Sequence, residues 1–344
     1  MPNSPLISIV IPNHNGAGYL ENCLRSLLAQ TYPRMEIVVV DNASGDQSVE
    51  TAHATAPRAV VLRQERNLGF AGGANAGIQA STGDWVAILN NDTEVAANWL
   101  SECESAIQRH PDAAFLACRI LDFRDRSRLY SAGDCFLRCG LGYRRGQDRL
   151  DGAEYRRECE TFSASGCAAL YRGPVLREAG GYDERYFAYL EDVDLGLRLR
   201  AAGHSGYYVP GAEVYHHGAA TSGGEFSHLA VRLRTRNSLF LLLKCLPASI
   251  LLRCLPMIFL AQLVWPARAA AHGRLPDYLR GMGEALALAP ALIRERTRMR
   301  GHWRTSKSRL WNSILESESL ARRDFARSDP EPVSVFLEWY FRLF

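Results

Sequence analysis

The chain lacks the cysteine and charge patterns that mark several classes of protein. Its nine cysteines form no C-x-x-C pair, and their odd number and irregular spacing argue against a disulfide framework or a zinc site and for a reducing cytosol. It has no basic run and no interleaving of aromatic and basic residues, and its net charge of +3 is too small to indicate a nucleic-acid partner. Residues 1–5 carry no basic residue before the first apolar segment, so we expect no signal peptide.

The C-terminal part lacks an uncharged segment long enough to cross a bilayer. Residues 239–265 are strongly apolar, but charged residues and prolines interrupt them at Lys244, Pro247, Arg253 and Pro256. The longest uncharged stretch, residues 254–267, has 14 residues, whereas a spanning helix needs ~20. Seven arginines follow, namely Arg268, Arg274, Arg280, Arg294, Arg296, Arg298 and Arg300. This combination favours helices lying at a membrane surface; buried helices of a small subdomain and a true span are the alternatives.

We therefore divide the chain into residues 1–238, an α/β domain, and residues 239–344, a helical C-terminal region. Apolar and amphipathic segments alternate in the first part at the spacing of βαβ units, which predicts a mostly parallel, doubly wound sheet flanked by helices. Residues 124–158 are charged and poorly patterned. Expected strands cover 6–11, 36–40, 59–62, 85–89, 115–121, 163–171, 207–210 and 214–218. Expected helices cover 19–30, 48–54 and 191–202, with one more after the glycine-rich residues 67–75.

Two amides and a carboxylate, Asn90, Asn91 and Asp92, directly follow the buried strand expected at 85–89. Ligands of open α/β sheets bind just beyond the carboxyl ends of the strands. A short hard acid there, beside amide oxygens, suits Mg²⁺ or Mn²⁺ held together with a substrate phosphate. The alternative is ordinary turn chemistry after a strand.

Asp41 ends a second buried strand and so reaches the same edge of the sheet. A carboxylate there can accept the N–H of a pyrimidine base, with Pro12 and Asn13 lining the same pocket. Residues 41–44 can also cap the next helix, and the two functions are compatible because a helix N-terminus is a usual seat for a nucleotide. The glycines of residues 69–75 fit neither G-x-G-x-x-G nor the Walker A pattern, but they let the backbone approach a ribose or phosphate.

Three acids, Glu191, Asp192 and Asp194, stand at the start of an expected helix, where the helix dipole favours acids whatever their function. Asp192 shares the inward-facing side with Leu195 and Leu199. A carboxylate at the edge of a buried face can have a raised pKa and serve as a general base. The aromatic residues before it offer flat surfaces for sugar rings or bases: Tyr182, Tyr186, Phe187 and Tyr189.

His216 and His217 end a later strand, so one can point inward while the other is exposed. Either can complete a metal shell begun by Asp92, because imidazole and carboxylate together suit Mn²⁺. A single histidine in such a position is more often structural.

Taken together and in order along the chain, these segments resemble the family 2 glycosyltransferases of the GT-A fold. The matching segments are 8–15, 38–44, 67–77, 89–92, 165–166, 181–184, 189–195 and residue 216. The resemblance is closest to rhamnosyltransferase-like and galactofuranosyltransferase-like members that build bacterial surface polysaccharides. It implies inverting transfer of a sugar from a UDP- or dTDP-sugar to a hydroxyl of a glycan or lipid-linked acceptor. The enzyme would work in the cytoplasm, on the inner face of the cell membrane.

The resemblance also implies roles for individual residues. Asp192 would be the base that deprotonates the acceptor hydroxyl, and Asp92 and His216 would hold the Mg²⁺ or Mn²⁺ that bridges the diphosphate. Asp41 would hold the uracil or thymine, with the other nucleotide-binding residues being Pro12, Asn13, Asn15, Asn67, Gly72, Asn75, Asn90 and Asn91. The acceptor or sugar pocket would contain Gly166, Tyr189 and Glu191.

Two departures from the family pattern bear on function. Asn90 replaces the first acid of the DxD element, so one anionic metal ligand is missing. Residues 232–237 contain no Q-x-x-R-W signature of processive members, which favours one sugar per encounter. Two other functions stay open. A catalytically inactive sugar-nucleotide scaffold is favoured by Asn90, whereas a sugar nucleotidyltransferase is disfavoured because residues 13–16 lack its basic loop residue.

Overall fold

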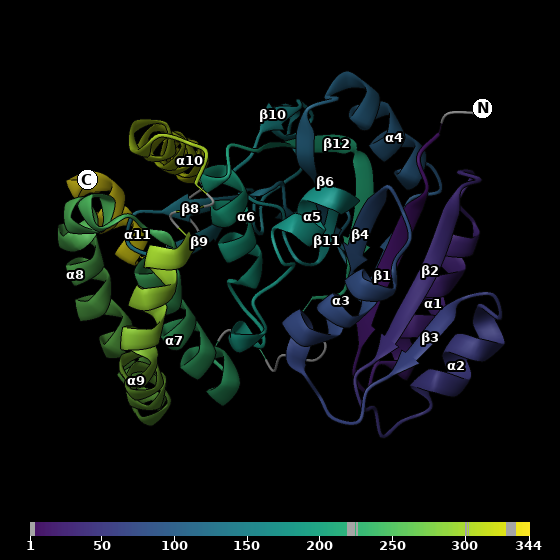
Figure 1. Cartoon of the computed structure of the whole chain (residues 1–344), viewed down its shortest axis with the longest axis horizontal. Coiled ribbons are helices and arrows are strands. Elements are labelled where there is room, and N and C mark those ends of the chain that lie inside the picture. Colours follow the sequence, from purple (N-terminus) through teal and green to yellow (C-terminus); the bar gives the residue numbers. More distant parts are fainter. Residues whose placement is uncertain (1–3, 219–223, 225, 300, 302, 328–334) are drawn as a thin grey trace.

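The computed structural model describes residues 4–218, 224, 226–299, 301, 303–327 and 335–344. Its centre is a ten-stranded mixed sheet whose main path runs β10-β12-β6-β11-β4-β1-β2-β3, with β5 and β7 pairing at the side (Figure 1). The strands are β1 (Ile7–Asn13), β2 (Met35–Asp41), β3 (Val60–Arg63), β4 (Trp85–Leu89), β5 (Thr93–Val95), β6 (Ala113–Asp122), β7 (Leu129–Ser131), β10 (Cys159–Glu160), β11 (Ala168–Arg172) and β12 (Ser205–His216).

The N-terminal half of the sheet is parallel, as the alternation of strands and helices predicts. Strand β1 lies between β2 and β4 and pairs with both in parallel, and β3 extends the sheet beyond β2. The other half is mixed, because β11 inserts antiparallel between β4 and β6. The carboxyl ends of β1, β2 and β4 therefore meet at one edge.

Helices cover both faces of the sheet, because successive side chains of each strand point to opposite faces and both sets are apolar. Ile7, Ile9 and Ile11 pack under α1 (Ala17–Leu28), α2 (Ser48–Thr55) and α4 (Trp99–Arg109). Val10 and Val40 point to the opposite face, which is covered by α3 (Gly69–Ala80), α5 (Gly173–Glu178) and α6 (Glu191–Ala201). The result is the predicted three-layer α/β domain.

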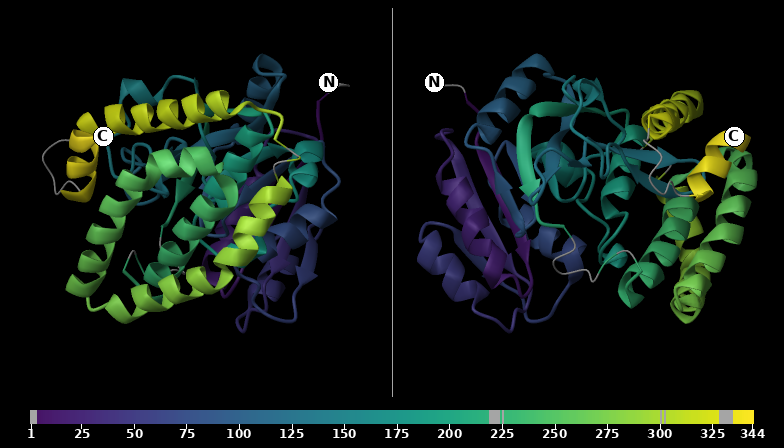
Figure 2. Two further views of the ribbon diagram at one scale, coloured as in Figure 1. Left: turned by 60° about the vertical axis from the view of Figure 1, so that its left-hand side comes forward. Right: turned by 180° about the vertical axis from the view of Figure 1, so that it is seen from behind.

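The C-terminal region is helical and packs beside this domain (Figure 2). It comprises α7 (His228–Cys245), α8 (Ala248–Ala271), α9 (Leu275–Met299), α10 (Lys307–Ala326) and α11 (Val335–Leu343). The hairpin of β8 (Asp134–Leu137) and β9 (Leu141–Arg144) lies between α6 and α10, and β8 packs on α10 (Figure 1). The predicted domain boundary at residues 238/239 lies inside α7.

The structure changes three details of the expected secondary structure. The glycine-rich segment forms no loop, since α3 begins at Gly69, and a Cβ on Gly77 would lie 2.2 Å from Cγ1 of Val10. Small residues therefore serve close packing of α3 on the sheet. Within 163–171, only Ala168–Arg172 joins the sheet. The two segments around 207–210 and 214–218 form one strand, β12, whose pairing shifts register between Val209 and Glu213.

The poorly patterned residues 124–158 hold β7, β8, β9 and the 3₁₀ turn η1 (Ala153–Tyr155). Among the described residues, α8 is the single helix that is long and apolar enough to cross a membrane, with 22% of its most apolar window buried. One such helix, judged by length and composition, is weak evidence for a span. Arg300 of the predicted basic series lies outside the described residues.

Candidate active site

Three strand ends are joined by side-chain hydrogen bonds at the carboxyl edge of the sheet. Asn13 ends β1 opposite Asp41 of β2, and both are buried. The amide nitrogen of Asn91, just after β4, donates to Oδ1 of Asn13 over 2.6 Å. Asn13 in turn donates to Oγ of Ser44, 3.3 Å away, after β2. The predicted nucleotide-binding residues Asn13, Asp41 and Asn91 therefore belong to one cluster.

Asp41 carries an acceptor that the protein leaves unused. Its side chain is 3% exposed, and Oδ2 accepts the backbone N–H of Ser44 at 3.4 Å. Its other oxygen, Oδ1, is buried and has no hydrogen-bond partner among the residues that the structure describes. A buried, unpaired carboxylate oxygen is unfavourable by about 1–3 kcal/mol, so it is a suitable acceptor for a ligand N–H.

Asp92 and His216 come together from distant segments, as the metal prediction requires. Nε2 of His216 lies 3.1 Å from Oδ1 of Asp92, and both side chains are buried. The backbone bond from His217 N–H to Asp92 carbonyl, 3.0 Å, holds the two strand ends side by side. His217 is half-buried and stacks on Phe123, so the inward histidine is His216.

The Asp92–His216 pair fits part of a cation shell. Two adjacent ligands of an octahedral Mg²⁺ or Mn²⁺ lie about 3 Å apart, which matches the spacing of this pair. Among the described residues, no group of three or more His, Cys, Asp or Glu side chains is placed to hold a metal. The protein thus offers one carboxylate and one imidazole, and the other ligands of a cation here have to come from phosphate oxygens and water.

The remaining predicted nucleotide-binding residues lie around this edge with different contacts. Asn15 is exposed and accepts the N–H of Gly45, and Asn67 accepts the N–H of Gly69 at the start of α3. Pro12 and Asn90 are half-buried at the ends of β1 and β4. Gly72 faces its own helix neighbour, since a Cβ there would lie 2.5 Å from Cβ of Leu68.

Asn75 is committed to the protein itself. Its amide nitrogen donates to the carbonyl of Tyr182 over 2.8 Å, and its amide oxygen accepts the N–H of the same residue over 2.9 Å. This pair of bonds ties α3 to the segment that leads into α6. Asn75 therefore fixes the position of the Asp192 segment.

Two consecutive residues, Gly166 and Cys167, connect Asp192 to the end of β4 by hydrogen bonds. Its Oδ2 accepts the N–H of Gly166 at 2.9 Å, and the next residue, Cys167, accepts the N–H of Asn90 through its carbonyl at 2.9 Å. Burial raises the pKa of Asp192, while the N–H groups of Gly166 and Val193 oppose that rise. The base candidate is thus oriented by the predicted pocket residue Gly166.

Glu191 is buried next to Asp192. Both carboxylate oxygens of Asp192 accept hydrogen bonds, whereas one oxygen of Glu191 accepts none from the described residues. Burial and the charge of Asp192 raise the pKa of Glu191 well above its usual range, and within the described part of the chain its Oε2 has no hydrogen-bond partner. The side chain lies near Gly166, where an added Cβ would be 3.5 Å from its Oε1. The predicted acceptor-pocket residues Gly166 and Glu191 are therefore neighbours.

The loop before Asp192 has a strained backbone that sequence analysis missed. Phe187, Tyr189 and Leu190 have φ of +63°, +70° and +67°, in the left-handed region that disfavours non-glycine residues. Asn237 of α7, which is fully buried, donates from Nδ2 to the carbonyls of Tyr186, Ala188 and Tyr189. Helix α7, which crosses the predicted domain boundary at residues 238/239, thus holds the predicted sugar-pocket residue Tyr189 in place.

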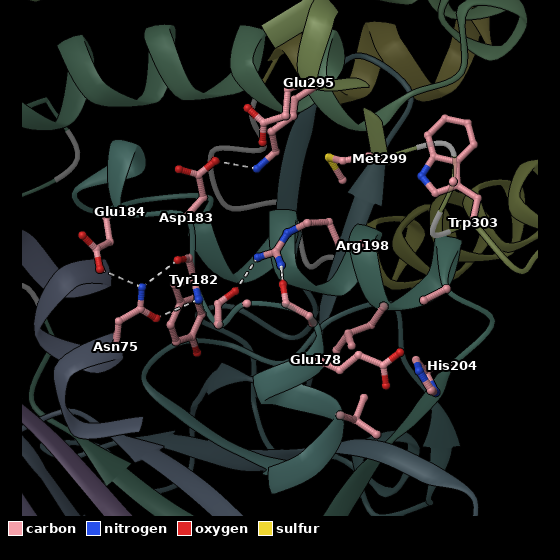
Figure 3. A pocket seen from close by; sticks show the side chains of 18 of the residues that line it. Asn75, Glu178, Tyr182, Asp183, Glu184, Arg198, His204, Glu295, Met299 and Trp303 are labelled. Carbon is pink, nitrogen blue, oxygen red and sulfur yellow. Dashed lines mark hydrogen bonds and ion pairs between the residues drawn. The ribbon is translucent and has the colours of Figure 1, made fainter. Parts of the chain in front are cut away.

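Buried ion pairs and hydrogen bonds hold the segment that leads into the loop before Asp192, around Gly181 and Asp183 (Figure 3). Arg198 donates to the carbonyl of Gly181 over 2.6 Å and pairs with Asp194 at 2.7 Å. Lys244, 1% exposed, pairs with Asp183 at 2.7 Å and Asp194 at 2.5 Å. Asp183, Arg198 and Lys244 border a cavity of about 610 Å³ whose lining includes none of the carboxylates at the sheet edge. Its cations are paired with acids, so we assign it to support of the loop.

Sequence analysis also missed Asp134 and Arg144, which belong to the poorly patterned insert. Burial and the charge of Asp192 raise the pKa of Asp134 to about 7. Asp134 faces Arg144 across the β8–β9 hairpin. No local pattern marks these residues, because the short hairpin is positioned by α10 rather than by its own sequence.

Known proteins share both the sequence and the fold of this chain. The model of "Glycosyl transferase family 2" matches residues 8–179. An N-acetylglucosaminyl-diphospho-decaprenol L-rhamnosyltransferase of Mycobacterium tuberculosis is 31% identical over 254 residues, covering 65% of this chain and 80% of the relative. An uncharacterized protein of Sinorhizobium fredii, y4gI, is 31% identical over 240 residues, which is 65% of this chain but 26% of the relative's length.

Two solved structures share the architecture. The mannosyltransferase PcManGT from Pyrobaculum calidifontis, in complex with GDP-Man and Mn²⁺, has a TM-score of 0.52 and 19% identity, covering 90% of this chain and 87% of its own. S. aureus TarS 1–349 has a TM-score of 0.53 and 18% identity, covering 92% and 91%. At these identities the likeness shows the fold alone. The family match and the rhamnosyltransferase relative decide the assignment: this chain is a glycosyltransferase and belongs to glycosyltransferase family 2.

Proposed function

We propose that the chain is an inverting, metal-dependent, non-processive glycosyltransferase of cell-surface polysaccharide synthesis. It takes a sugar, rhamnose-like or other, from a UDP- or dTDP-sugar and transfers it to a hydroxyl of a glycan or lipid-linked acceptor. One observation carries the proposal: three groups lie along the same edge of the sheet. They are Oδ1 of Asp41, which accepts no hydrogen bond from the described residues, the Asp92–His216 pair, and the carboxylate of Asp192, which Gly166 orients. The relative that uses a decaprenyl-diphosphate acceptor supports the acceptor class.

The reaction is a single displacement at the anomeric carbon. The acceptor oxygen attacks that carbon as its proton passes to Asp192, and the bond to the nucleoside diphosphate breaks with inversion. The raised pKa of Asp192 strengthens it as a base, and the N–H of Gly166 fixes the direction of its lone pairs. The buried hydrogen bond from Asn91 to Asn13 keeps the ends of β1 and β4 together during the step.

Asp92 and His216 are the residues that would hold a divalent cation, and a bound cation would offset the charge of the departing diphosphate. Solved structures of this fold contain Mn²⁺, which supports the use of such an ion. The half-buried Asn90 lacks the charge of an acid at the same place. We therefore expect weaker metal binding than a site with two acids would give.

Turnover with a donor series tests the proposal. UDP and dTDP release from candidate sugar nucleotides is measured with Mn²⁺, with Mg²⁺ and with EDTA, for wild type and for Asp192→Asn. We expect metal-dependent release in wild type and a loss of at least about 100-fold in the variant, as for removal of a general base. Unchanged turnover in Asp192→Asn excludes it as the base. Binding of donors by wild type without any turnover supports the inactive scaffold, for which Asn90 is the supporting feature.

We also propose that residues 239–344 bind the inner face of the membrane, which keeps the enzyme in the cytoplasm near lipid-linked acceptors. One face of α8 exposes Leu252, Leu255, Phe259 and Leu263, each 50–66% exposed. The region contains 16 Arg and Lys against 9 Asp and Glu, a net charge of +7, whereas residues 1–238 have −4. An exposed apolar helix face in a basic region is suited to anionic lipid headgroups.

Sedimentation with vesicles tests this surface. Wild type is expected to bind phosphatidylglycerol vesicles more strongly than phosphatidylcholine vesicles. The double variant Phe259→Asp, Leu263→Asp is expected to bind at least about tenfold more weakly, because both substitutions remove apolar side chains that would be buried in the membrane. The matched control is Leu28→Asp, at an exposed leucine on α1. Equal binding by the α8 variant and wild type would rule this face out.

A further inference from the structure

Arg144 lies between the metal pair and the base candidate. It is half-buried at the end of β9, and its guanidinium carbon lies 4.4 Å from the centre of the Tyr130 ring. Tyr130 meets the ring of His216 edge-on, with the ring centres 4.3 Å apart. A continuous stack therefore leads from Arg144 to the residue that faces Asp92.

Arg144 also lies close to the base side of the site. Its positive charge lowers the pKa values of Asp192 and Asp134, against the larger effect of their burial, and that of Cys167 beside Gly166. These three groups surround the hydrogen bonds that connect the end of β4 to α6. Arg144 therefore contacts Tyr130, next to His216, and lies within electrostatic reach of Asp192.

The guanidinium has no anionic partner among the described residues. No ion pair and no hydrogen bond from its side chain occurs there, although Asp134 is its cross-strand neighbour. Two other arginines differ: Arg138 of the same insert pairs with Glu318, and Arg119 of β6 pairs with Asp151. A half-buried guanidinium that stacks on an aromatic ring keeps its N–H donors available.

We propose that Arg144 is a phosphate-binding residue of this active site. The forked N–H donors of a guanidinium match two oxygens of a phosphate. Asp92 and Asp192 are anionic and repel a phosphate, and the positive charge of Arg144 offsets this repulsion. The phosphate belongs either to the donor diphosphate or to a diphosphate-linked acceptor. This inference rests on the proposed transferase function.

Calorimetric titration of nucleotides separates the inference from the function on which it rests. UDP, dTDP and the matching nucleosides are titrated with Mn²⁺ into wild type, Arg144→Ala, Arg144→Lys and the control Arg128→Ala. Arg128 belongs to the same insert, but it is exposed and pairs with Asp125 on the surface. KM for donor and acceptor is measured on the same proteins, and thermal unfolding checks that each variant folds.

If Arg144 binds the donor, Arg144→Ala weakens nucleoside diphosphate binding at least about tenfold, as for a lost charge-assisted hydrogen bond, and leaves nucleoside binding unchanged. If it binds the acceptor, diphosphate binding is unchanged and acceptor KM rises by a similar factor. Arg144→Lys, which keeps the charge but not the fork, falls between wild type and alanine. A folded Arg144→Ala that matches Arg128→Ala in every readout overturns the inference. Wild type that binds no nucleotide overturns the proposed function instead.

Discussion

Asn237 offers the sharpest test of how the C-terminal region contributes to the active site. Its two amide hydrogens serve the carbonyls of Tyr186, Ala188 and Tyr189 at 3.1, 2.9 and 2.7 Å. The loop includes three residues with positive φ, each unfavourable by about 1–3 kcal/mol when unsupported. The loop is therefore expected to relax when these bonds are removed.

Asn237→Ala removes the donor of the half-buried carbonyls of Ala188 and Tyr189, whereas the carbonyl of Tyr186 keeps donors from the Ala188 N–H and from Arg236. At about 1–3 kcal/mol for each of the two carbonyls, we expect the free energy of unfolding to fall by about 2–6 kcal/mol. Relaxation of the loop also moves Asp192, which starts the next helix. Because a displacement of about 1 Å can reduce a rate about 100-fold, we expect kcat to fall by that order while nucleotide binding is retained.

Urea denaturation gives the stability, and initial rates at saturating donor, at a temperature where the variant is folded, give kcat. The matched control is Met257→Ala in α8, at a buried position of a C-terminal core cluster that, among the described residues, contains no residue of the loop. It is expected to lose about 2–5 kcal/mol through a cavity and to keep its kcat. The reasoning is refuted if both variants lose stability to the same extent and keep the same kcat.

Three further results are expected. Asp41→Ala weakens uridine or thymidine binding, measured by calorimetry, while binding of inorganic diphosphate with Mn²⁺ stays unchanged. Activity falls as pH drops through the raised pKa of Asp192, because the protonated carboxyl cannot take the proton of the acceptor hydroxyl, and the acid limb of the kcat/KM profile measures this midpoint. Lys244→Met removes the cation that Asp183 and Asp194 share, while Arg185 and Arg198 still pair with them, and lowers the free energy of unfolding by about 1.5–3 kcal/mol, seen in urea. A variant with unaltered stability would show that Lys244 is dispensable.

The contacts of Lys244 also bear on the domain boundary proposed at residue 239. Removal of everything after residue 238 cuts α7 and deletes the cation that pairs with Asp183 and Asp194. Truncation therefore perturbs the loop before Asp192 as well as any membrane contact. Point substitutions on α8 are the cleaner test of membrane binding.

The sequence by itself determined the parts of the protein whose information is local. Strands buried on both faces are near-continuous apolar runs, so β1, β2 and β4 and the polar residues at their ends could be read directly. Residues at the ends of adjacent parallel strands must share an edge. The proximity of Asn13, Asp41 and Asn91 followed from that geometry.

Only the tertiary structure decided the parts that depend on contacts between distant segments. The glycine-rich segment looks like a loop in sequence, and only the folded chain shows that it starts helix α3 and that Gly77 lets this helix pack closely on Val10 of the sheet. Asn237 and Arg144 carry no local signal, because their importance comes from a strained loop 48–51 residues earlier and from an aromatic stack onto His216. The sequence states which chemical group each position carries, whereas the fold decides which distant group it contacts.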